Sequence, residues 1–460
     1  MFCESKLTAA LCVLLFSGGC ASLPDTQFLS DRYEKQASRF KSAWGPLSEK
    51  RSAAIVALLK RANGDLDILD RQTVLEQQIG GSALVVGNKV TLLQDGPATY
   101  SAMFAAIRAA KDHINIESYI IEEGDVGRQF ADALLERRAA GVQVNVIYDS
   151  VGAFTTSKAF FDRLTLAGAQ VVEFNPVNPL NAKKSWAPGH RDHRKLLVVD
   201  GAIAFLGGIN ISSVYSSGSS IGRSERPVDP ATGWRDTDVQ IEGPVVAEFE
   251  KLFRQTWDKQ HGKPLAQKAD AQPAPPRGND IVRAIGSTPD DAFSLIYLTV
   301  VSAITNAEKQ VYITNAYFVP DPQLLKALID AARRGVDVRL ILPSQSDSAA
   351  AFHAGRSYYD RLLEAGVKIY ERRGSLLHVK TAIVDGVWSC VGSSNLDWRS
   401  ALDNDEVNAV IVGREFGLQM QAVYAKDMAA SDAIDLAGWR QRPLADRLKE
   451  VGARLWGPLL

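Results

Sequence analysis

One arrangement of polar residues occurs twice in this chain with identical internal spacing, and it constrains the fold more strongly than any other feature. The arrangement is His-x-Lys-x4-Asp-x6-Gly-x2-Asn, and the two copies begin 185 residues apart. The first copy consists of His193, Lys195, Asp200, Gly207 and Asn210, and the second consists of His378, Lys380, Asp385, Gly392 and Asn395. Five positions that recur without a change in spacing indicate a duplication. We therefore predict two related halves, each of which supplies half of one active site.

The segments around each copy alternate between strands and helices in the same order. In the first half the predicted strands are 114–119, 141–148 and 168–174, and the predicted helices are 126–140 and 160–167. In the second half the strands are 311–314, 335–342 and 366–370, and the helices are 324–334 and 358–365. This alternation predicts an α/β fold of two lobes, with mixed but mostly parallel sheets and helices on both faces. The apolar runs 196–199 and 381–384, which follow the two lysines, have the composition of buried parallel strands.

The composition of the chain divides it further into regions. These are an export signal (1–20), an N-terminal helical segment (21–80), the first lobe (81–263), a Pro- and Ala-rich linker (264–280), the second lobe (281–428) and an amphipathic tail (429–460). At the start of the first lobe, Gly87 and Asn88 separate two apolar runs, which predicts strand, turn and strand. The tail has apolar residues at helical spacing with Arg and Lys between them. It either docks on the body of the protein or lies in a membrane interface, and docking is the commoner arrangement.

The first twenty residues resemble a bacterial lipoprotein signal. The apolar run 7–16 is too short to span a bilayer but has the length found in export signals. Small residues then lead to Cys20, which would become the lipidated N-terminus. The resemblance implies a protein anchored in the bacterial cell envelope and facing the periplasm, and Ala21 after the cysteine resembles the sorting pattern of the outer membrane. The alternative is a retained hydrophobic anchor or an N-terminal core helix.

The balance of charges argues against a nucleic-acid partner. Lys and Arg number 52 and Asp and Glu number 53, so the chain lacks the basic surplus that nucleic-acid binders usually carry. Three of the four cysteines lie in the first twenty residues, which excludes a disulfide framework. No group of carboxylates, His or Cys has the spacing of a metal site. We therefore expect neither a metal nor another cofactor.

The repeated residues suit the chemistry of phosphodiesters. Residues two apart in a strand face the same side, so each histidine projects together with its lysine. One imidazole can attack phosphorus while a second donates a proton to the departing alkoxide, and the ammonium groups can hold the non-bridging oxygens. Further donors for a phosphate pocket are expected from Gly207, Gly208, Gly392, Ser393 and Ser394. A single His-x-Lys would more simply be an exposed polar pair, so it is the matched second copy that argues for catalysis.

Both copies match the motif of the phospholipase D superfamily, and the resemblance covers roughly residues 80–425. The stretch 191–210, the stretch 234–244 and the tail from Trp439 to Leu444 look most like the bacterial cardiolipin synthase branch. The resemblance implies that His193 and His378 share the nucleophile and general-acid roles, that Lys195 and Lys380 bind phosphate, and that Asn210 and Asn395 assist. It also implies that Asp236 and Glu406 hold the imidazoles and that Asp200 and Asp385 stabilise the motif turns.

By the same resemblance the chain folds as two phospholipase D-like α/β/α lobes with the active site at their interface. The implied reaction moves a phosphatidyl group from a phospholipid, either phosphatidylglycerol or phosphatidylethanolamine, to a histidine and then to phosphatidylglycerol, which gives cardiolipin at a membrane surface. The alternative is hydrolysis to phosphatidic acid. A nuclease is disfavoured by the neutral charge, and a non-catalytic envelope lipoprotein by the two intact motifs. Because both motifs lie in one chain, no second subunit is needed to complete the site.

The two halves differ in one place. Gly168 and His193 are 25 residues apart, whereas Gly366 and His378 are 12 apart, so the first half carries 13 additional residues before its motif. The inserted segment, 175–189, is predicted to be a loop beside the site. It either shapes the entry of the substrate or is an inert surface insertion.

Overall fold

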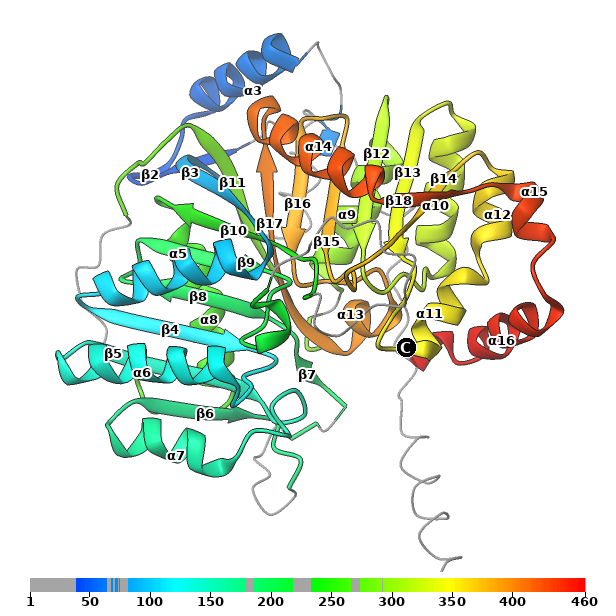
Figure 1. The fold of residues 1–460 in the computed structure, drawn as a ribbon. Coiled ribbons are helices and arrows are strands. Elements are labelled where there is room, and N and C mark those ends of the chain that lie inside the picture. Colours follow the sequence, from blue (N-terminus) through cyan, green and yellow to red (C-terminus); the bar gives the residue numbers. More distant parts are fainter. Residues whose placement is uncertain are drawn as a thin grey trace, which may run out of the picture.

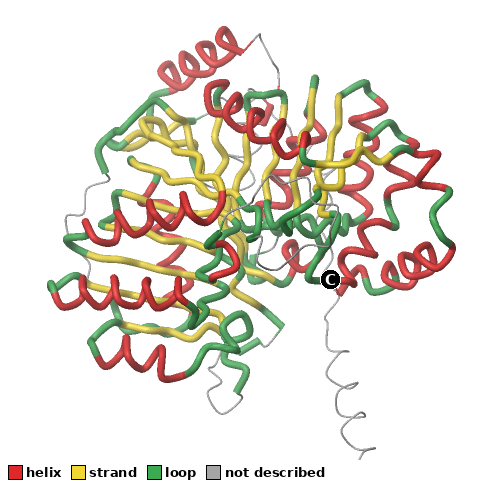
Figure 2. Tube along the Cα trace, in the orientation of Figure 1, coloured by secondary structure: helices red, strands yellow, loops and turns green. Residues whose placement is uncertain are grey.

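The computed structural model describes residues 39–63, 68, 71–72, 74, 82–178, 186–187, 189–217, 233–265, 274–291 and 293–459. Figure 1 shows two α/β lobes side by side, and Figure 2 shows strands at the centre of each lobe with helices around them. The expected export signal and Cys20 lie outside the described residues. So do parts of the segment 21–80, of the loop 175–189 and of the linker 264–280.

The elements of the two lobes follow the same order along the chain. The first lobe contains β3 (Leu84–Gln94), α5 (Asp95–Ala109), β4 (His113–Ser118), α6 (Asp125–Ala139), β5 (Gln143–Asp149), α7 (Lys158–Leu166), β6 (Gln170–Phe174), β7 (Arg191–Asp192), β8 (Lys195–Val199), β9 (Ile203–Gly207), η2 (Ser213–Tyr215), β10 (Thr237–Glu242) and α8 (Val246–Lys259). The second contains β11 (Asp280–Ser287), α9 (Leu295–Asn306), β12 (Gln310–Asn315), α10 (Pro322–Arg333), β13 (Asp337–Pro343), α11 (Ala349–Arg356), α12 (Tyr359–Glu364), β14 (Lys368–Arg372), β15 (Lys380–Val384), β16 (Trp388–Gly392), α13 (Trp398–Leu402), β17 (Asn404–Val412) and α14 (Arg414–Ala429). The α/β repeat that the sequence predicts is confirmed.

The sheets are mixed, but the expectation that they are mostly parallel is wrong. Their strand orders are β6–β5–β4–β8–β9–β10–β3 in the first lobe and β11–β17–β16–β15–β12–β13–β14 in the second. Within these orders only β4–β5–β6 and β12–β13–β14 are parallel. The motif strands β8 and β15 are antiparallel to both neighbours. Each returns through a three-residue turn, a connection that only antiparallel strands can use.

The first strand of the first lobe is continuous, which corrects the predicted strand, turn and strand. Gly87 lies inside β3 with φ 93°, and the partners of β3 change at this point. Val85 and Asn88 are paired with β11, whereas the part from Lys89 to Gln94 is paired with β10. The two residues that the sequence suggests as a turn therefore mark a change of sheet. β3 joins the sheet of one lobe to the sheet of the other.

Three apolar cores hold these layers together. The helices α5, α6 and α7 cover one face of the first sheet, and α9, α10 and α12 cover one face of the second. The third core is shared by the lobes and includes α8 and α14. On α8, Phe249, Phe253 and Trp257 recur every four residues, so they form one buried face. Since this core belongs to both lobes, it fixes how the two motifs meet.

The described residues near the two ends of the chain extend the lobes, and β1 pairs with β3 of the first lobe. The described part of 21–80 contains β1 (Phe40–Ser42), β2 (Gly45–Pro46) and α3 (Glu49–Asn63), so it is not helical throughout. The tail contains β18 (Ser431–Ile434), α15 (Leu436–Arg440), α16 (Leu444–Arg454) and η4 (Gly457–Leu459), and β18 pairs with β14. Among the helices of the described residues, none has the length and apolar character needed to cross a bilayer.

The acidic residue of each motif stabilises a turn, as the resemblance implies. Asp200 accepts hydrogen bonds from the backbone N–H groups of Lys111, Asp112 and His113 at 2.8–3.0 Å. Asp385 accepts the equivalent three bonds, at 2.7–2.9 Å, from the backbone N–H groups of Glu308, Lys309 and Gln310. Both aspartates have positive φ, 53° and 52°, a conformation that Asp and Asn tolerate better than most residues. Each aspartate thus ties its motif turn to the start of the neighbouring strand.

Replacing Asp385 with Ala is expected to lower the free energy of unfolding by roughly 2–4 kcal/mol, because three backbone donors lose their acceptor. Denaturant unfolding measures this change. Asp432→Ala is the control, since its ion pair with Arg373 is largely exposed and the change should stay within about 0.5 kcal/mol. Equal stability of the two variants would contradict the structural role of Asp385.

Candidate active site

The two motif histidines line one cavity of about 300 Å³ at the junction of the lobes. His193 lies between β7 and β8, and His378 lies two residues before the start of β15. Both are largely buried, at 9% and 4% exposure. Asn210 and Asn395, one from each motif, also line this cavity. The duplicated residues therefore converge as the sequence predicts.

Backbone hydrogen bonds across the junction place each histidine against the other lobe. The N–H of His193 donates to the carbonyl of Asp405 at 2.9 Å, and the N–H of His378 donates to the carbonyl of Arg235 at 2.8 Å. In both cases the next residue along the chain is an acid, Glu406 or Asp236. The register of these contacts thus brings the carboxylate of one lobe to the imidazole of the other.

Each imidazole is held at Nδ1 by a carboxylate from the opposite lobe. His193 Nδ1 lies 3.0 Å from Glu406 Oε1, and His378 Nδ1 lies 2.8 Å from Asp236 Oδ2. Both carboxylates are completely buried. The Ser393 hydroxyl also donates to Glu406 and fixes its orientation. Because Nδ1 is occupied, Nε2 is the nitrogen of each ring that remains for chemistry.

Burial favours the neutral form of both histidines. It lowers the pKa of His193 to about 4, although Glu406 opposes the shift. Burial and the charge of Lys380 likewise lower the pKa of His378. Burial alone would raise the pKa of Glu406, but His193, Lys195 and the Ser393 hydroxyl lower it to about 2. The first pair is therefore a neutral imidazole that donates from Nδ1 to a carboxylate.

The motif lysines contact the histidines but are not among the residues that line the cavity. Lys195 Nζ donates to the carbonyl of His193 at 2.6 Å, and Lys380 Nζ donates to the carbonyl of His378 at 2.5 Å. Burial lowers the pKa of Lys195 to about 7 and that of Lys380 to about 8. An anion that enters between the lobes would favour the charged form of both ammonium groups.

The motif asparagines have different surroundings. Asn210 accepts a hydrogen bond from the N–H of Ile120 at 3.1 Å and donates to the Tyr215 hydroxyl at 3.3 Å. That hydroxyl lies 3.2 Å from His378 Nδ1. Asn395 Oδ1 is buried in the cavity wall and has no hydrogen-bond partner among the described residues. Asn395 is thus the one of the two whose side chain is still available to a ligand.

The structure corrects the predicted phosphate pocket. Gly207, Gly208, Gly392, Ser393 and Ser394 do not line the cavity that holds the histidines. The N–H of Ser393 already donates to the carbonyl of Val407, and that of Ser394 donates to Asn408 Oδ1. A side chain at Gly208 would overlap the carboxylate of Asp236. Gly208 therefore leaves room for the carboxylate that holds His378, and Ser393 orients the carboxylate that holds His193. Spacing alone does not distinguish these roles from phosphate binding.

Gly208→Ala is expected to reduce turnover roughly 100-fold with the fold retained, because the added methyl group displaces Asp236 and so misplaces His378. Initial rates and circular dichroism measure the two effects. Gly189→Ala is the matched control, since an added methyl group at Gly189 meets no atom of the described structure within 4 Å. Unchanged turnover in Gly208→Ala would contradict this role.

Two tyrosines that the sequence reasoning did not assign complete the symmetry of the site. Tyr119 and Tyr317 follow β4 and β12, line the cavity, and lie beneath Lys195 Nζ and Lys380 Nζ at 5.1 and 5.8 Å from their ring centres. Tyr119 precedes His193 by 74 residues and Tyr317 precedes His378 by 61. The difference equals the 13-residue insertion, so aligning the repeats around that insertion would have found the pair.

Other residues of the cavity wall carry charge and apolar surface. Arg191 and Arg399 contribute guanidinium groups, and Trp234 and Leu459 contribute apolar surface. Arg191 lies two residues before His193. Its guanidinium group is held by Asp149 and Ser150, which are distant in sequence and not part of the motif. Leu459 belongs to the tail, so the tail reaches the site. Nothing in the spacing of the sequence indicates that contact.

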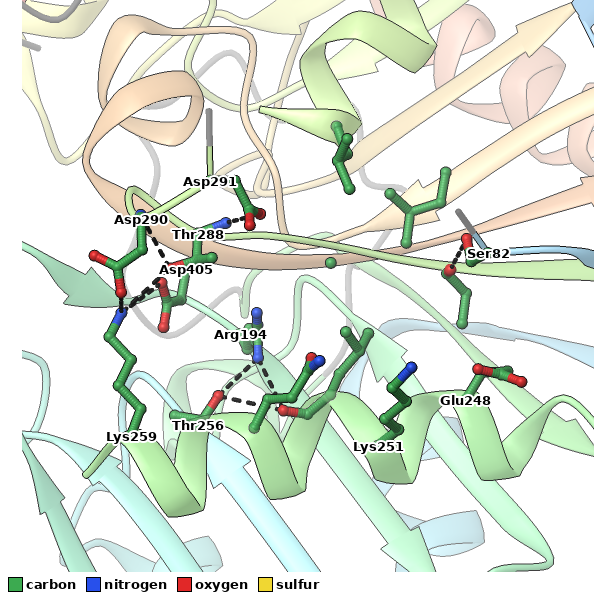
Figure 3. Close-up of a pocket in the computed structure, with 16 residues that line it drawn as sticks. Ser82, Arg194, Glu248, Lys251, Thr256, Lys259, Thr288, Asp290, Asp291 and Asp405 are labelled. Atoms are coloured by element: carbon green, nitrogen blue, oxygen red, sulfur yellow. Dashed lines mark hydrogen bonds and ion pairs between the residues drawn. The ribbon is translucent and has the colours of Figure 1, made fainter. Parts of the chain in front are cut away.

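A second cavity, of about 510 Å³, lies between α8 and β11 and contains no histidine (Figure 3). Arg194, the neighbour of His193, points into it and donates to Thr256 Oγ1 at 2.7 Å and to the carbonyl of Leu252 at 3.3 Å. Its Nε also donates to the carbonyl of Glu406 at 3.1 Å. Arg194 therefore links α8 to Glu406, the residue that holds His193. The second cavity is lined by residues that position the site and not by the motif histidines.

Comparisons with known proteins agree with this arrangement. The family described as "Cardiolipin synthase, PLD-like domain" matches residues 103–219 and 300–428, and each segment contains one copy of the motif. The cardiolipin synthase of Alkalihalophilus pseudofirmus is 34% identical over 435 residues, which cover 94% of this chain and 83% of that protein. A cardiolipin synthase of a Geobacillus species is 35% identical over 395 residues, which cover 84% of this chain and 75% of that protein.

Among solved structures, the phosphatidylserine synthase of Haemophilus influenzae is similar in fold. It has a TM-score of 0.64 over 85% of this chain and the whole of that chain, at 12% identity. The likeness in fold, the extent of the sequence match and the duplicated histidine site lead to the same assignment. The chain belongs to the cardiolipin synthase family of proteins with phospholipase D-like domains.

Proposed function

We propose that this protein is a phosphatidyltransferase that makes cardiolipin from phosphatidylglycerol and a phospholipid donor through a phosphohistidine intermediate. The observation that carries the proposal is the pair of imidazoles in one cavity, each held at Nδ1 by the carboxylate of the opposite lobe. The names of the relatives support the choice of lipid substrates.

In the first half-reaction, Nε2 of one histidine attacks the phosphorus of the donor lipid. The bond from phosphorus to the head-group oxygen breaks, and the second histidine, as imidazolium, gives its proton to the departing alkoxide. Burial favours the neutral form of both rings, whereas the general acid must be protonated. The negative charge of the bound phosphodiester raises the pKa of the second ring and so supplies the protonated form. Lys195 and Lys380 stabilise the charge that develops on the phosphoryl oxygens.

In the second half-reaction, the head-group hydroxyl of phosphatidylglycerol replaces the departed alcohol. The second histidine, now neutral, accepts the hydroxyl proton while the oxygen attacks phosphorus and the bond from phosphorus to nitrogen breaks. The product is cardiolipin. When phosphatidylglycerol is also the donor, the released alcohol is glycerol.

The cavity wall favours a lipid acceptor over water. Phosphatidylglycerol carries a phosphate of its own, and Arg191 and Arg399 supply positive charge in the cavity wall. Trp234 and Leu459 provide apolar surface where water would otherwise stand. An acceptor bound by these groups competes with water for the phosphohistidine.

We also propose that Cys20 is lipidated and anchors the protein in the cell envelope with its lobes in the periplasm, at the outer membrane. The proposal rests on the apolar run and small residues that precede Cys20. The relatives are bacterial cardiolipin synthases, which agrees with a bacterial protein that works at a membrane. Labelling of cells with a radioactive fatty acid tests it, with Cys20→Ser as the control. A chain that carries no more label than Cys20→Ser would contradict it.

The activity is tested with purified protein and labelled phosphatidylglycerol in mixed micelles. We expect labelled cardiolipin together with one glycerol for each cardiolipin formed. The His193→Ala His378→Ala double variant is the control for contaminating activity. Formation of phosphatidic acid alone, without cardiolipin at any concentration of phosphatidylglycerol, would contradict the transferase proposal and show that the protein is a hydrolase.

A further inference from the structure

The helix α16 turns its apolar side toward solvent. Leu444, Leu448, Val451 and Leu455 follow one another at spacings of four, three and four, which place them on one side of the helix. Their side chains are 68%, 63%, 62% and 80% exposed. A helix of a soluble domain normally buries such a stripe against its core. We refer to these four residues as the α16 stripe.

The opposite side of α16 is polar and holds the helix in place. Glu450 is 2% exposed and lies 2.5 Å from the guanidinium group of Arg442, which stacks on Trp439 at 3.9 Å. Trp439 in turn packs on Tyr359 of α12. Turning the helix to bury the stripe would break this ion pair, and separating a buried pair is strongly destabilising. The outward position of the stripe is therefore built into the fold.

The stripe leads directly to the catalytic cavity. After α16, Trp456 is 58% exposed, and Leu459 in η4 is 54% exposed and also lines the cavity that contains His193 and His378. Figure 1 shows α16 beside α11, and Ala351 of α11 lines the same cavity. An apolar surface thus runs from α16 to the place where substrate must enter.

The first lobe carries an exposed aromatic residue in a loop that packs on a residue of the cavity wall. Phe154 is 76% exposed, in the loop after β5. In this loop Gly152 packs so closely on the backbone carbonyl of Tyr119 that a side chain there would overlap it. Tyr119 lines the cavity, so the loop that carries Phe154 packs against the cavity wall.

Basic residues flank the stripe. Arg447 and Arg454 are exposed, and they follow Leu444 and Val451 by three residues, which places both on the same flank. The acidic residues of α16 are engaged elsewhere, Glu450 with Arg442 and Asp446 with Lys449. An apolar stripe with arginines beside it matches an anionic lipid interface, where acyl chains meet negatively charged head groups.

We propose that α16 lies in the interface of an anionic phospholipid bilayer and holds the mouth of the catalytic cavity against that surface. Lipids would then pass from the bilayer into the site along Trp456 and Leu459. This inference deepens the proposed function and rests on it for the choice of a phospholipid surface. Two other occupants of the stripe, a second copy of the chain and residues 1–38, are separated by the experiment.

The first test places an environment-sensitive fluorophore at position 455 of the full chain, as Leu455→Cys with Cys3, Cys12 and Cys20 changed to Ser. Cys390 is buried and stays unlabelled. With vesicles that contain phosphatidylglycerol, the emission should rise several-fold and shift to shorter wavelength. The same label at Leu418→Cys is the control, because Leu418 is 51% exposed on α14, at the end of the lobe away from α16 (Figure 1).

Three outcomes would overturn the proposal. Emission at 455 that does not respond to vesicles, or that responds as it does at 418, excludes insertion of α16. Emission that is already high without lipid and independent of protein concentration indicates that residues 1–38 cover the stripe. Emission that rises with protein concentration in the absence of lipid indicates a second copy. A labelled chain that inserts but makes no cardiolipin refutes the proposed function and leaves the docking intact.

The second test uses Leu448→Glu, with Leu418→Glu as control. Leu448→Glu should weaken binding to phosphatidylglycerol vesicles about tenfold or more and lower turnover of lipid in vesicles to a similar extent. Turnover of dissolved short-chain phosphatidylglycerol should equal that of the unaltered chain. An equal loss on both substrates would mean that Leu448 supports the fold of the site, and the docking proposal would fail.

Discussion

Replacing either His193 or His378 with alanine will reduce transfer by about 10,000-fold or more, because each half-reaction needs one imidazole as nucleophile and the other as proton carrier. The two losses will not add in the double variant, since removing one partner already disables the pair. Rates with labelled phosphatidylglycerol measure the effect. His261→Asn is the control, because His261 lies outside the cavity and keeps its positive φ as Asn.

The same variants will also assign the two roles. The nitrophenolate group of a nitrophenyl phosphodiester leaves without needing a proton. The variant that lacks the general acid will therefore still form the phosphohistidine from this substrate. The variant that lacks the nucleophile will not. Acid quenching and mass spectrometry of peptides from around residues 193 and 378 identify the modified ring. Full activity on phosphatidylglycerol in either single variant would refute the mechanism.

Glu406→Gln and Asp236→Asn will lower turnover about 100- to 10,000-fold while the chain still folds. Each amide can keep a hydrogen bond to Nδ1, but it cannot stabilise the positive charge that each ring acquires in the cycle, and it permits the wrong tautomer. The exposed Glu415→Gln is the control. The loss should appear in kcat with dissolved short-chain lipid, where binding to a surface plays no part.

The Glu406→Gln change should also shift the pKa of His193 in a definite direction. Burial lowers the pKa of His193 to about 4, and the Glu406 carboxylate opposes that shift. Removing the carboxylate will therefore lower the pKa of His193 further, which imidazole resonances in NMR titrations can follow. Because folded His193 binds fewer protons than the unfolded residue between pH 4 and its ordinary 6.5, acidification through this window also destabilises the unaltered chain. A higher pKa of His193 in the variant would contradict the assigned electrostatics.

Much of the site could be predicted from the sequence because the motif that forms it occurs twice with the same spacing. Matched spacing identified the histidines, lysines, asparagines and turn aspartates without any knowledge of the fold. The roles of Asp236 and Glu406 came from family resemblance and not from spacing. Their physical basis, the backbone bonds between His193 and Asp405 and between His378 and Arg235, joins residues that are far apart in the chain.

The errors have physical causes as well. The runs in β8 and β15 are apolar on both faces, and such runs have the same composition in parallel and antiparallel sheets, so the composition gave no sign of their partners. In β3, Gly87 and Asn88 between two apolar runs suggested a turn, but the strand continues there with Gly87 at positive φ and changes sheets. The periodicity of α16 revealed an apolar stripe but not its direction, which depends on the burial of Glu450.

The exchange of carboxylates between the lobes also matters while the protein is being made. A chain that has folded only its first lobe has His193 without Glu406, and one that lacks the first lobe has His378 without Asp236. Neither fragment holds an oriented imidazole or a second one to complete the proton transfer. Catalytic competence therefore arrives only with the last-synthesised half. Nascent or truncated copies that lack either lobe therefore cannot complete the transfer.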